Sequence, residues 1–351
     1  MNETRLLIPP RDLRSALVVN VSRIGDTLLA TPAIRAIAAA YPEVEITCLG
    51  HPKRVEVLEH LPFVHRTGGI TKNSAALRGW LPGQRYDAAF VFGFDRGLLA
   101  YALRVAGKVA AFRQGDPALD RKLFRAVEDP APQSRHAVLM RMALLEPLGI
   151  ASDGLYLSYR VTEEESAWAR SALATAHPSR PAPLVGLQIA SFPTKGYRDW
   201  PVDRFEALCA RVLDRWPKAH FFVFGGNLER DRARALADRF AGSATSWAGK
   251  LTLRQTAALM NVLDLYVGVD TGPTHIMGAL RRPMVPLYHC HSPSWMLAPL
   301  GHPCCYPVDH PRAGGDCTTE TPMAEITVDR VWAKVVEALA ANPPQEIRAA
   351  T

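Results

Sequence analysis

The chain has 351 residues, of which 48% are hydrophobic and 21% are charged, and its formal net charge is +7. This length accommodates two domains of ordinary size, each with its own core. No segment contains the ~20 consecutive apolar residues that cross a bilayer, and the N-terminal segment lacks the apolar core of a signal peptide, so we expect a cytoplasmic protein. The positive charge favours an anionic partner, but the arginines are scattered without a nucleic-acid-binding motif, which argues against nucleic acid.

The first half of the chain alternates short apolar segments with helical ones. The apolar segments predict strands of a parallel sheet that is covered on both faces, at residues 15–21, 44–50, 87–93 and 108–112. Helices are predicted at residues 32–40, 53–60, 98–105, 136–148 and 163–176. The fourth of these ends at Gly149, and the fifth begins after Thr162 as its N-cap.

A Pro-rich stretch at residues 177–183 is the predicted linker, and the alternation restarts after it. Strands are predicted at 184–190, 220–225, 265–269 and 284–288, and helices at 202–215, 229–240, 253–261, 273–280 and 328–341. We therefore predict an α/β protein with two Rossmann-like domains, 1–176 and 184–327, whose parallel sheets face a central cleft. The C-terminal segment 328–351 could pack on either domain.

The turn after the first predicted strand reads SRIGDTLLATPAIRAI, with Gly25 and Asp26 where a ligand sits in open α/β sheets. Thr31, just before Pro32, would serve as helix cap and leave Asp26 without a capping duty. Gly25 lets the backbone approach a ligand closely, and a carboxylate beside it can act as general base towards a hydroxyl. The alternative is a solvated acid paired with Arg23.

The segment LYVGVDTGPTHIMGAL predicts a strand, a turn and a helix. Asp270, Thr271 and Gly272 fill the turn, and Pro273 lies in the first helical turn, where it costs no hydrogen bond. Free backbone N–H groups and the helix dipole make such a turn suitable for phosphate. The alternative is that Asp270 or Thr271 merely caps the helix, with His275 packed beside it.

Two further strand ends carry charged residues. Lys195 and Arg198 follow the strand at 184–190 and could neutralise a diphosphate, or belong to an ordinary basic loop. Glu229 follows the strand at 220–225 and could accept a ribose hydroxyl or favour the N-terminus of its helix.

The six cysteines are expected to be thiols rather than a disulfide framework. Five metal-ligand side chains gather late in the chain, namely Cys290, His291, Cys304, Cys305 and Cys317. Their spacing matches neither paired C-x-x-C nor C-x-x-C with H-x-x-x-H. We therefore expect loop thiols and no metal.

Taken in order, five segments resemble glycosyltransferase family 9, the ADP-heptose:lipopolysaccharide heptosyltransferases. They are RIGDTLLATPAIRAI, HAVLMRMALLEPLGI, GGNLERDRA, AGKLTLRQTAALM and VGVDTGPTHIMGAL. The resemblance implies a GT-B fold with the donor in the C-terminal domain. It also implies an inverting, single-displacement transfer that needs no metal and no other cofactor.

The resemblance implies a role for each matching residue. Asp26 resembles the catalytic base, flanked by Gly25 and Thr27 of the same motif. The donor-binding turn and its neighbours are Asp270, Thr271, Gly272, Pro273 and His275. Glu229 is similar in position to the acid that holds the ribose, and Leu251 to the apolar residue that packs on adenine. Lys195 is preferred for the diphosphate, with Arg198 as its substitute.

The implied function is transfer of heptose from ADP-heptose to a lipopolysaccharide core, an anionic glycolipid. Contacts with this acceptor are expected from the basic loops at 66–83 and 113–135, and peripheral contact with the inner membrane stays open. The alternatives are the same transfer to an autotransporter protein or capsular glycan, and a non-catalytic nucleotide-sugar-binding protein. A dinucleotide-binding regulator or oxidoreductase would need G-x-G-x-x-G after a first strand, which neither half has.

Overall fold

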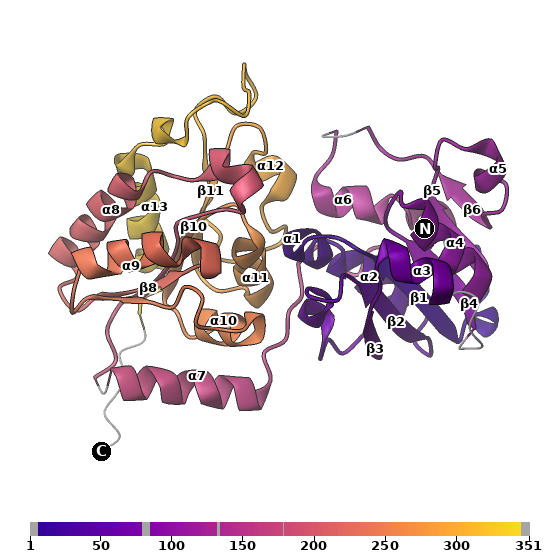
Figure 1. The fold of residues 1–351 in the computed structure, drawn as a ribbon, viewed down its shortest axis with the longest axis horizontal. Coiled ribbons are helices and arrows are strands. Elements are labelled where there is room, and N and C mark those ends of the chain that lie inside the picture. The colour runs from indigo at the N-terminus through magenta and orange to yellow at the C-terminus, as the bar shows by residue number, and fades with distance from the viewer. Residues whose placement is uncertain (1–5, 79–84, 132–133, 178, 345–351) are drawn as a thin grey trace. The chain divides into compact units, whose positions relative to one another are not determined.

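The computed structural model describes residues 6–78, 85–131, 134–177 and 179–344, which form two compact units (Figure 1). The first unit lies within residues 1–160 and the second within 161–351. The division therefore precedes the predicted linker at 177–183, and the helix α7 (Glu163–Ala176) belongs to the second unit. This helix packs on α10 (Leu253–Met260), where the Arg254 guanidinium donates to both Glu165 carboxylate oxygens at 2.6 and 2.7 Å.

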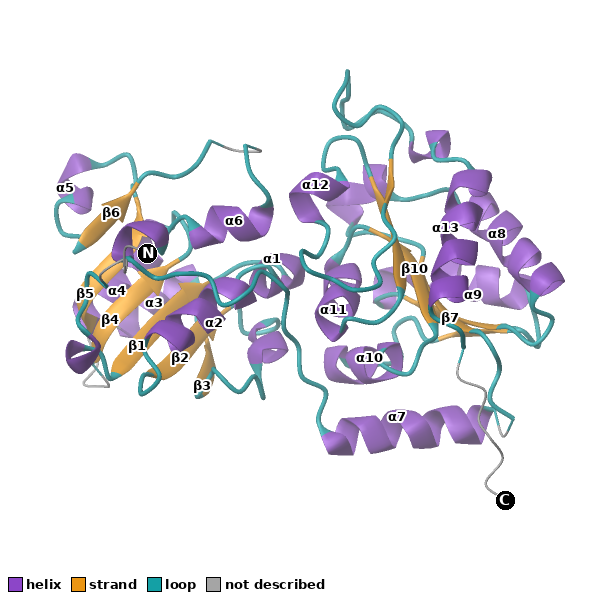
Figure 2. Cartoon of the chain, turned by 180° about the vertical axis from the view of Figure 1, so that it is seen from behind, coloured by secondary structure: helices purple, strands orange, loops and turns teal. Residues whose placement is uncertain are grey.

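The first unit is built on a six-stranded parallel sheet in the order β3-β2-β1-β4-β5-β6 (Figure 2). Its strands are β1 (Ser15–Asn20), β2 (Glu45–Gly50), β3 (Arg66–Gly69), β4 (Tyr86–Val91), β5 (Ala106–Phe112) and β6 (Arg125–Val127). Its α-helices are α1 (Ile24–Leu28), α2 (Thr31–Ala40), α3 (Lys72–Arg78), α4 (Arg96–Val105), α5 (Pro117–Asp120) and α6 (Ala137–Met142). Short 3-10 turns are η1 (Pro10–Asp12), η2 (Val55–Leu58) and η3 (Glu146–Leu148).

The second unit holds another six-stranded parallel sheet, in the order β12-β11-β10-β7-β8-β9. Its strands are β7 (Leu184–Gln188), β8 (His220–Phe224), β9 (Ala244–Ser246), β10 (Leu265–Val269), β11 (Met284–Tyr288) and β12 (Val308–Asp309). Besides α7 and α10, its helices are α8 (Val202–Arg215), α9 (Arg230–Arg239), α11 (Gly272–Leu280), α12 (Ser294–Leu297) and α13 (Val328–Ala341). Its 3-10 turns are η4 (Pro193–Arg198), η5 (Asn227–Glu229) and η6 (Met323–Glu325).

Both sheets have the same connectivity: from the first strand of the unit, two strands extend one way and three extend the other way. The direction of strand order reverses between β1 and β4 in the first unit and between β7 and β10 in the second. Ligands of open α/β sheets bind outside the carboxyl ends of the strands at such reversal points. The predicted α/β class with two Rossmann-like halves is confirmed.

All eight predicted strands are present, and the differences concern short or interrupted elements. The predicted helix at 53–60 is only the 3-10 turn η2. The predicted helix at 136–148 ends at Met142 and resumes as η3, because Pro147 lacks an N–H and its ring would clash with the carbonyl four residues earlier. Strands β3, β6, β9 and β12 were not predicted, since two to four residues carry too little pattern.

The last helix, α13, packs within the second unit against α8 and β10–β12. It buries one face there, formed by Val331, Val335, Ala338 and Leu339. Among the described residues no helix is long and apolar enough to span a bilayer.

Candidate functional site

The carboxyl ends of β7 and β10, where the second sheet reverses its strand order, bring together Asp270, Arg198 and His275. Asp270 follows β10, and its carboxylate is almost completely buried, with 1% of the side chain exposed. Arg198 Nη1 donates to Asp270 Oδ2 at 2.5 Å, and His275 Nε2 lies 3.3 Å from Asp270 Oδ1. Two of the predicted donor-site residues, Asp270 and Arg198, therefore form an ion pair, and Asp270 orients His275.

The environment of Asp270 holds its carboxyl group in the charged form. Burial acts to raise its pKa, but the hydrogen bond from His275 and the positive charge of Arg198 act against burial, so the pKa lies below the ordinary value. Because the Asp270 carboxylate compensates the charge of Arg198, this arginine stabilises the turn and is not a free cation.

Lys195 differs from Arg198 in this respect. Among the residues that the structure describes, no carboxylate lies within salt-bridge distance of its ammonium group, and the Nζ atom is 3.5 Å from the Tyr197 hydroxyl. The Tyr197 ring lies 5.5 Å from both Lys195 Nζ and the Arg198 guanidinium carbon. The loop thus presents one uncompensated positive charge beside an ion pair.

The loop that carries these cations is held in place at several points. Ser191 N donates to Asp199 Oδ1 at 2.6 Å, and Arg232 Nη1 donates to Asp199 Oδ2 at 2.8 Å. Trp200, which is fully buried, donates from its ring N–H to the Ile326 carbonyl at 2.9 Å. These contacts hold both ends of the loop in place, as a binding site requires.

The turn after β10 leads directly into helix α11, which begins at Gly272 with Pro273 in its first turn. Thr274 donates to the Val269 carbonyl at 2.6 Å and so ties the helix back to the strand. Thr271 is the N-cap, but its side chain caps no N–H group, and its buried hydroxyl has no hydrogen-bond partner among the described residues. The first N–H groups of α11 are therefore left for a ligand, as an anion site needs.

Two other predicted donor residues lie in the same unit. Glu229 Oε2 accepts from the Gly226 N–H at 2.8 Å, so this carboxylate caps the turn η5 and presents one further oxygen. Leu251 is partly exposed and precedes Thr252, the N-cap of α10. Both remain candidates for contacts with a nucleoside.

In the first unit Asp26 lies on the short helix α1, which begins soon after β1 ends. Its Oδ1 atom accepts from Arg141 Nη2 of α6 at 2.8 Å, so the partner is Arg141 and not Arg23. Thr27 is buried, and its hydroxyl donates to the Arg23 carbonyl at 2.9 Å. The prediction that Thr31 caps the next helix is wrong: Thr31 is the first residue of α2, and its hydroxyl donates backwards to the Leu28 carbonyl.

A pocket of about 650 Å³ lies where the first sheet reverses its strand order. It is lined by Val19 and Val21 at the end of β1 and by the segment 91–98 at the end of β4. Phe94 in that segment is 55% exposed, and its ring stacks on Phe112 with centroids 6.0 Å apart. Lys72 and Arg96 also line this pocket, where Lys72 Nζ lies 3.0 Å from Asp95 Oδ2 and Arg96 Nη2 lies 3.6 Å from Asp116 Oδ2. The pocket therefore combines an aromatic face with paired charges.

The basic loop 113–135 borders a second pocket of about 550 Å³, also in the first unit. Its arginines are balanced by acids, since Arg113 pairs with Glu128, and Arg135 lies 3.6 Å from Glu146.

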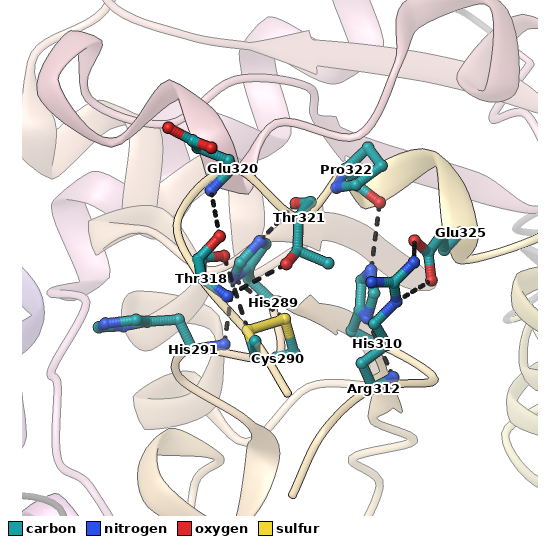
Figure 3. The surroundings of a disulfide bond; sticks show 11 residues. His289, Cys290, His291, His310, Arg312, Thr318, Glu320, Thr321, Pro322 and Glu325 are labelled. Carbon is teal, nitrogen blue, oxygen red and sulfur yellow. Dashed lines mark hydrogen bonds and ion pairs between the residues drawn. A yellow bond between two sulfur atoms is a disulfide. The ribbon is translucent and has the colours of Figure 1, made fainter. Parts of the chain in front are cut away.

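The expectation that all six cysteines are thiols is wrong. Cys290, just after β11, forms a disulfide with Cys317, and Figure 3 shows His289 and the loop from Thr318 to Pro322 around it. His289 Nε2 donates to the Thr321 carbonyl at 2.8 Å, and its Nδ1 accepts from the His291 N–H at 3.1 Å. Cys290 and Cys317 are too far apart in the sequence for spacing alone to predict that they form a disulfide.

A ring nitrogen of His289 and the Sγ atoms of Cys290 and Cys317 lie within 4.8 Å of one another, as metal ligands would. In the structure the two sulfur atoms are bonded to each other and the imidazole nitrogen accepts a backbone hydrogen bond, so all three are engaged. The ring of His289 also contacts Tyr197, with centroids 5.0 Å apart, which links this cluster to the loop of Lys195.

Sequence reasoning missed two residues of these sites. Tyr197 lies between Lys195 and Arg198 and contacts both, a position that the motif itself could have indicated. Arg141 contacts Asp26 across 115 positions in the sequence, and only the packing of α6 brings it there.

Comparison with known proteins gives consistent results. Residues 82–303 match the family described as glycosyltransferase family 9 (heptosyltransferase). The chain is 24% identical over 282 residues to lipopolysaccharide heptosyltransferase 3 of Escherichia coli, an alignment that covers 75% of this chain and 80% of that protein.

Solved structures give the same picture for the fold, which is GT-B. A family 9 glycosyltransferase from Veillonella parvula has a TM-score of 0.77 at 19% identity, covering 93% of this chain and 96% of its own. The E. coli heptosyltransferase WaaC with ADP has a TM-score of 0.69 at 18% identity, covering 92% and 99%.

Proposed function

Because the chain belongs to glycosyltransferase family 9, the heptosyltransferase family, we propose that it transfers heptose from ADP-heptose to a lipopolysaccharide core. The observation that carries the proposal is the arrangement at the carboxyl ends of β7 and β10. There an uncompensated lysine, a buried ion pair and an open helix N-terminus lie at a sheet reversal point. Relatives named as lipopolysaccharide heptosyltransferases, and a similar structure named with ADP, favour this donor and acceptor.

On the donor side, the first N–H groups of α11 and the hydroxyl of Thr271 bind the diphosphate oxygens, and the Lys195 ammonium neutralises their charge. Arg198 and His275 act through Asp270 to hold the turn in this geometry. Glu229 accepts hydrogen bonds from the ribose, and Leu251 packs on the adenine. These groups stabilise the negative charge that builds up on ADP as it leaves, so the reaction needs no metal ion.

On the acceptor side, Asp26 is the general base, and the pocket at Phe94 binds the sugar chain of the acceptor. An aromatic face suits the apolar side of a sugar ring, and Lys72 and Arg96 suit its anionic groups. In the transfer, the acceptor hydroxyl oxygen forms a bond to the anomeric carbon of heptose while the bond from that carbon to the diphosphate breaks. The electron pair of the broken bond leaves with ADP, and the hydroxyl proton goes to Asp26.

The transfer inverts the anomeric carbon because it is a single displacement. Since the acceptor is a glycolipid, the protein would work at the cytoplasmic face of the inner membrane, as a peripheral protein.

The experiment combines two variants with one assay of transfer and one of ADP binding. Lys195→Ala should weaken ADP binding by about 1.5–3 kcal/mol, as the loss of a charge-assisted contact does. Asp26→Asn should lower kcat by about 10²- to 10⁴-fold and leave the Kd for ADP within about threefold, because Asp26 belongs to the other unit.

Two outcomes would contradict the assignments. Unchanged ADP affinity in Lys195→Ala, with a loss in Arg198→Ala, would transfer the diphosphate to Arg198. Normal transfer by folded Asp26→Asn would remove Asp26 as the base.

A further inference from the structure

We propose that Arg141 is a positioning residue for Asp26: it fixes one carboxylate oxygen and leaves the other to accept the proton of the acceptor hydroxyl. This inference rests on the proposed function, in which Asp26 is the general base.

The first argument is the geometry of the ion pair. Arg141 Nη2 donates to Asp26 Oδ1 at 2.8 Å, while Arg141 Nη1 donates to the Ala137 carbonyl of its own helix at 2.8 Å. The Arg141 guanidinium is thus held by two hydrogen bonds, and it does not move with the Asp26 carboxylate if that carboxylate rotates. Among the described residues Asp26 Oδ2 has no partner, so one oxygen is anchored and the other is available.

The second argument is the unequal exposure of the two side chains. The Arg141 side chain is 20% exposed, whereas that of Asp26 is 45% exposed. Burial lowers the pKa of Arg141 and the Asp26 charge opposes the effect, as for a cation enclosed by the fold beside its counter-ion. The arginine therefore belongs to the framework, and the carboxylate is the member of the pair that faces a substrate.

The third argument is that α1 alone holds Asp26 poorly. This helix has five residues and no side-chain cap at its N-terminus, and helices this short are marginal without outside contacts. A base must stay within about 1 Å of its productive place, since such a misplacement can cost about 10²-fold in rate. Packing on η2 and the buried residues Gly25, Thr27 and Leu28 hold the helix itself, and the contact with α6 restrains the Asp26 side chain.

The other cations on neighbouring elements do not hold the Asp26 carboxylate. Arg54, before η2, donates to the Ser22 carbonyl at 3.2 Å, and Arg35 of α2 donates to Asp153 and Ser158 at 2.9 and 2.7 Å. Within the described ranges, Arg141 is the one cation within 4 Å of the Asp26 carboxylate.

The test is a double-mutant cycle on the full chain, with sugar transfer, ADP affinity and urea unfolding measured for each variant. The variants are Arg141→Gln, Arg141→Lys, Asp26→Asn and the double variant Arg141→Gln with Asp26→Asn. Arg104→Gln is the matched control, because it removes another partly buried arginine of the first unit that donates to a backbone carbonyl, that of Ala75.

We expect Arg141→Gln to lower kcat by about 10- to 100-fold with the Kd for ADP unchanged within about threefold. Arg141→Lys should recover part of this loss, since it keeps a cation. In the Asp26→Asn background Arg141→Gln should have no further effect on kcat, because its target is already gone. Arg104→Gln should leave kcat of the folded protein as it is.

Two results would overturn the inference alone: a kcat in Arg141→Gln within threefold of wild type, or an equal loss in both backgrounds. Should Arg141→Gln not fold, the same cycle with Arg141→Met, which keeps much of the side-chain length without the cation, decides by the same criterion. Wild-type rates in Asp26→Asn, or a wild-type protein that transfers no heptose from ADP-heptose, would overturn the proposed function and this inference together.

Discussion

The buried ion pair of Arg198 and Asp270 gives a sharp prediction about stability. Arg198→Gln leaves the Asp270 carboxylate in a place where 1% of the side chain is exposed, with His275 as its remaining partner. Removing one partner of a buried pair costs about 3–5 kcal/mol. Because 19% of Arg198 is exposed, water can reach part of the vacated space, and we expect a loss nearer about 2–3 kcal/mol in the free energy of unfolding of the second unit.

The chain offers a control with the same interatomic distance. Arg211 and Asp329 are also 2.5 Å apart, but their side chains are 44% and 79% exposed. Arg211→Gln should therefore cost no more than about 1 kcal/mol, as is usual for surface pairs. Urea unfolding followed by circular dichroism and by tryptophan fluorescence measures both variants. Equal losses in the two variants, or a loss below about 1 kcal/mol for Arg198→Gln, would refute the argument that burial decides the energy.

Three further predictions concern a buried histidine, the cysteines and the absence of a metal requirement. Burial, followed by the charge of His177, lowers the pKa of His220 to about 4. Below pH ~6.5 the unfolded chain therefore binds a proton that the folded chain does not bind, and the free energy of unfolding should fall by up to about 3 kcal/mol as the pH drops from 6.5 to 4. His220→Phe should reduce this dependence of the free energy of unfolding on pH in urea titrations. Titration with a thiol reagent in denaturant should count four thiols without reduction and six after it, and six thiols in unreduced protein purified without reductant would contradict the disulfide. Sugar transfer should continue in excess EDTA, and activity that is lost in EDTA and restored by a divalent cation would contradict the metal-free mechanism.

The fold could be predicted largely because the strands of parallel sheets are buried on both faces. Segments such as SALVVN and LYVGV are nearly continuous apolar runs, and their strands lie where the runs do. The sequence predicts the helix at 163–176 with Thr162 as its N-cap, and in the structure this cap is part of a local capping box with Glu165. Interactions between residues that are close in the sequence can be predicted in this way.

The contacts that complete the sites could not be read so directly. Arg198 and Asp270 are 72 residues apart, and Asp26 and Arg141 are 115 apart. In the first case each residue had been singled out alone, and what was missing was the strand order that places β7 beside β10. In the second case the two residues lie on separate elements, α1 and α6, and no local pattern in the sequence links them.

The disulfide has a consequence for how the second unit resists unfolding. It joins residues 27 positions apart, and the chain between them holds only the short elements α12 and β12. Closing a loop of this length reduces the chain entropy of the unfolded state by an amount worth about 3–4 kcal/mol. A segment with so little regular structure thus owes much of its order to one covalent bond. The free energy of unfolding of the second unit, which carries Asp270, therefore depends on whether the surroundings keep this disulfide oxidised. Buffers with and without reductant should yield two different unfolding curves.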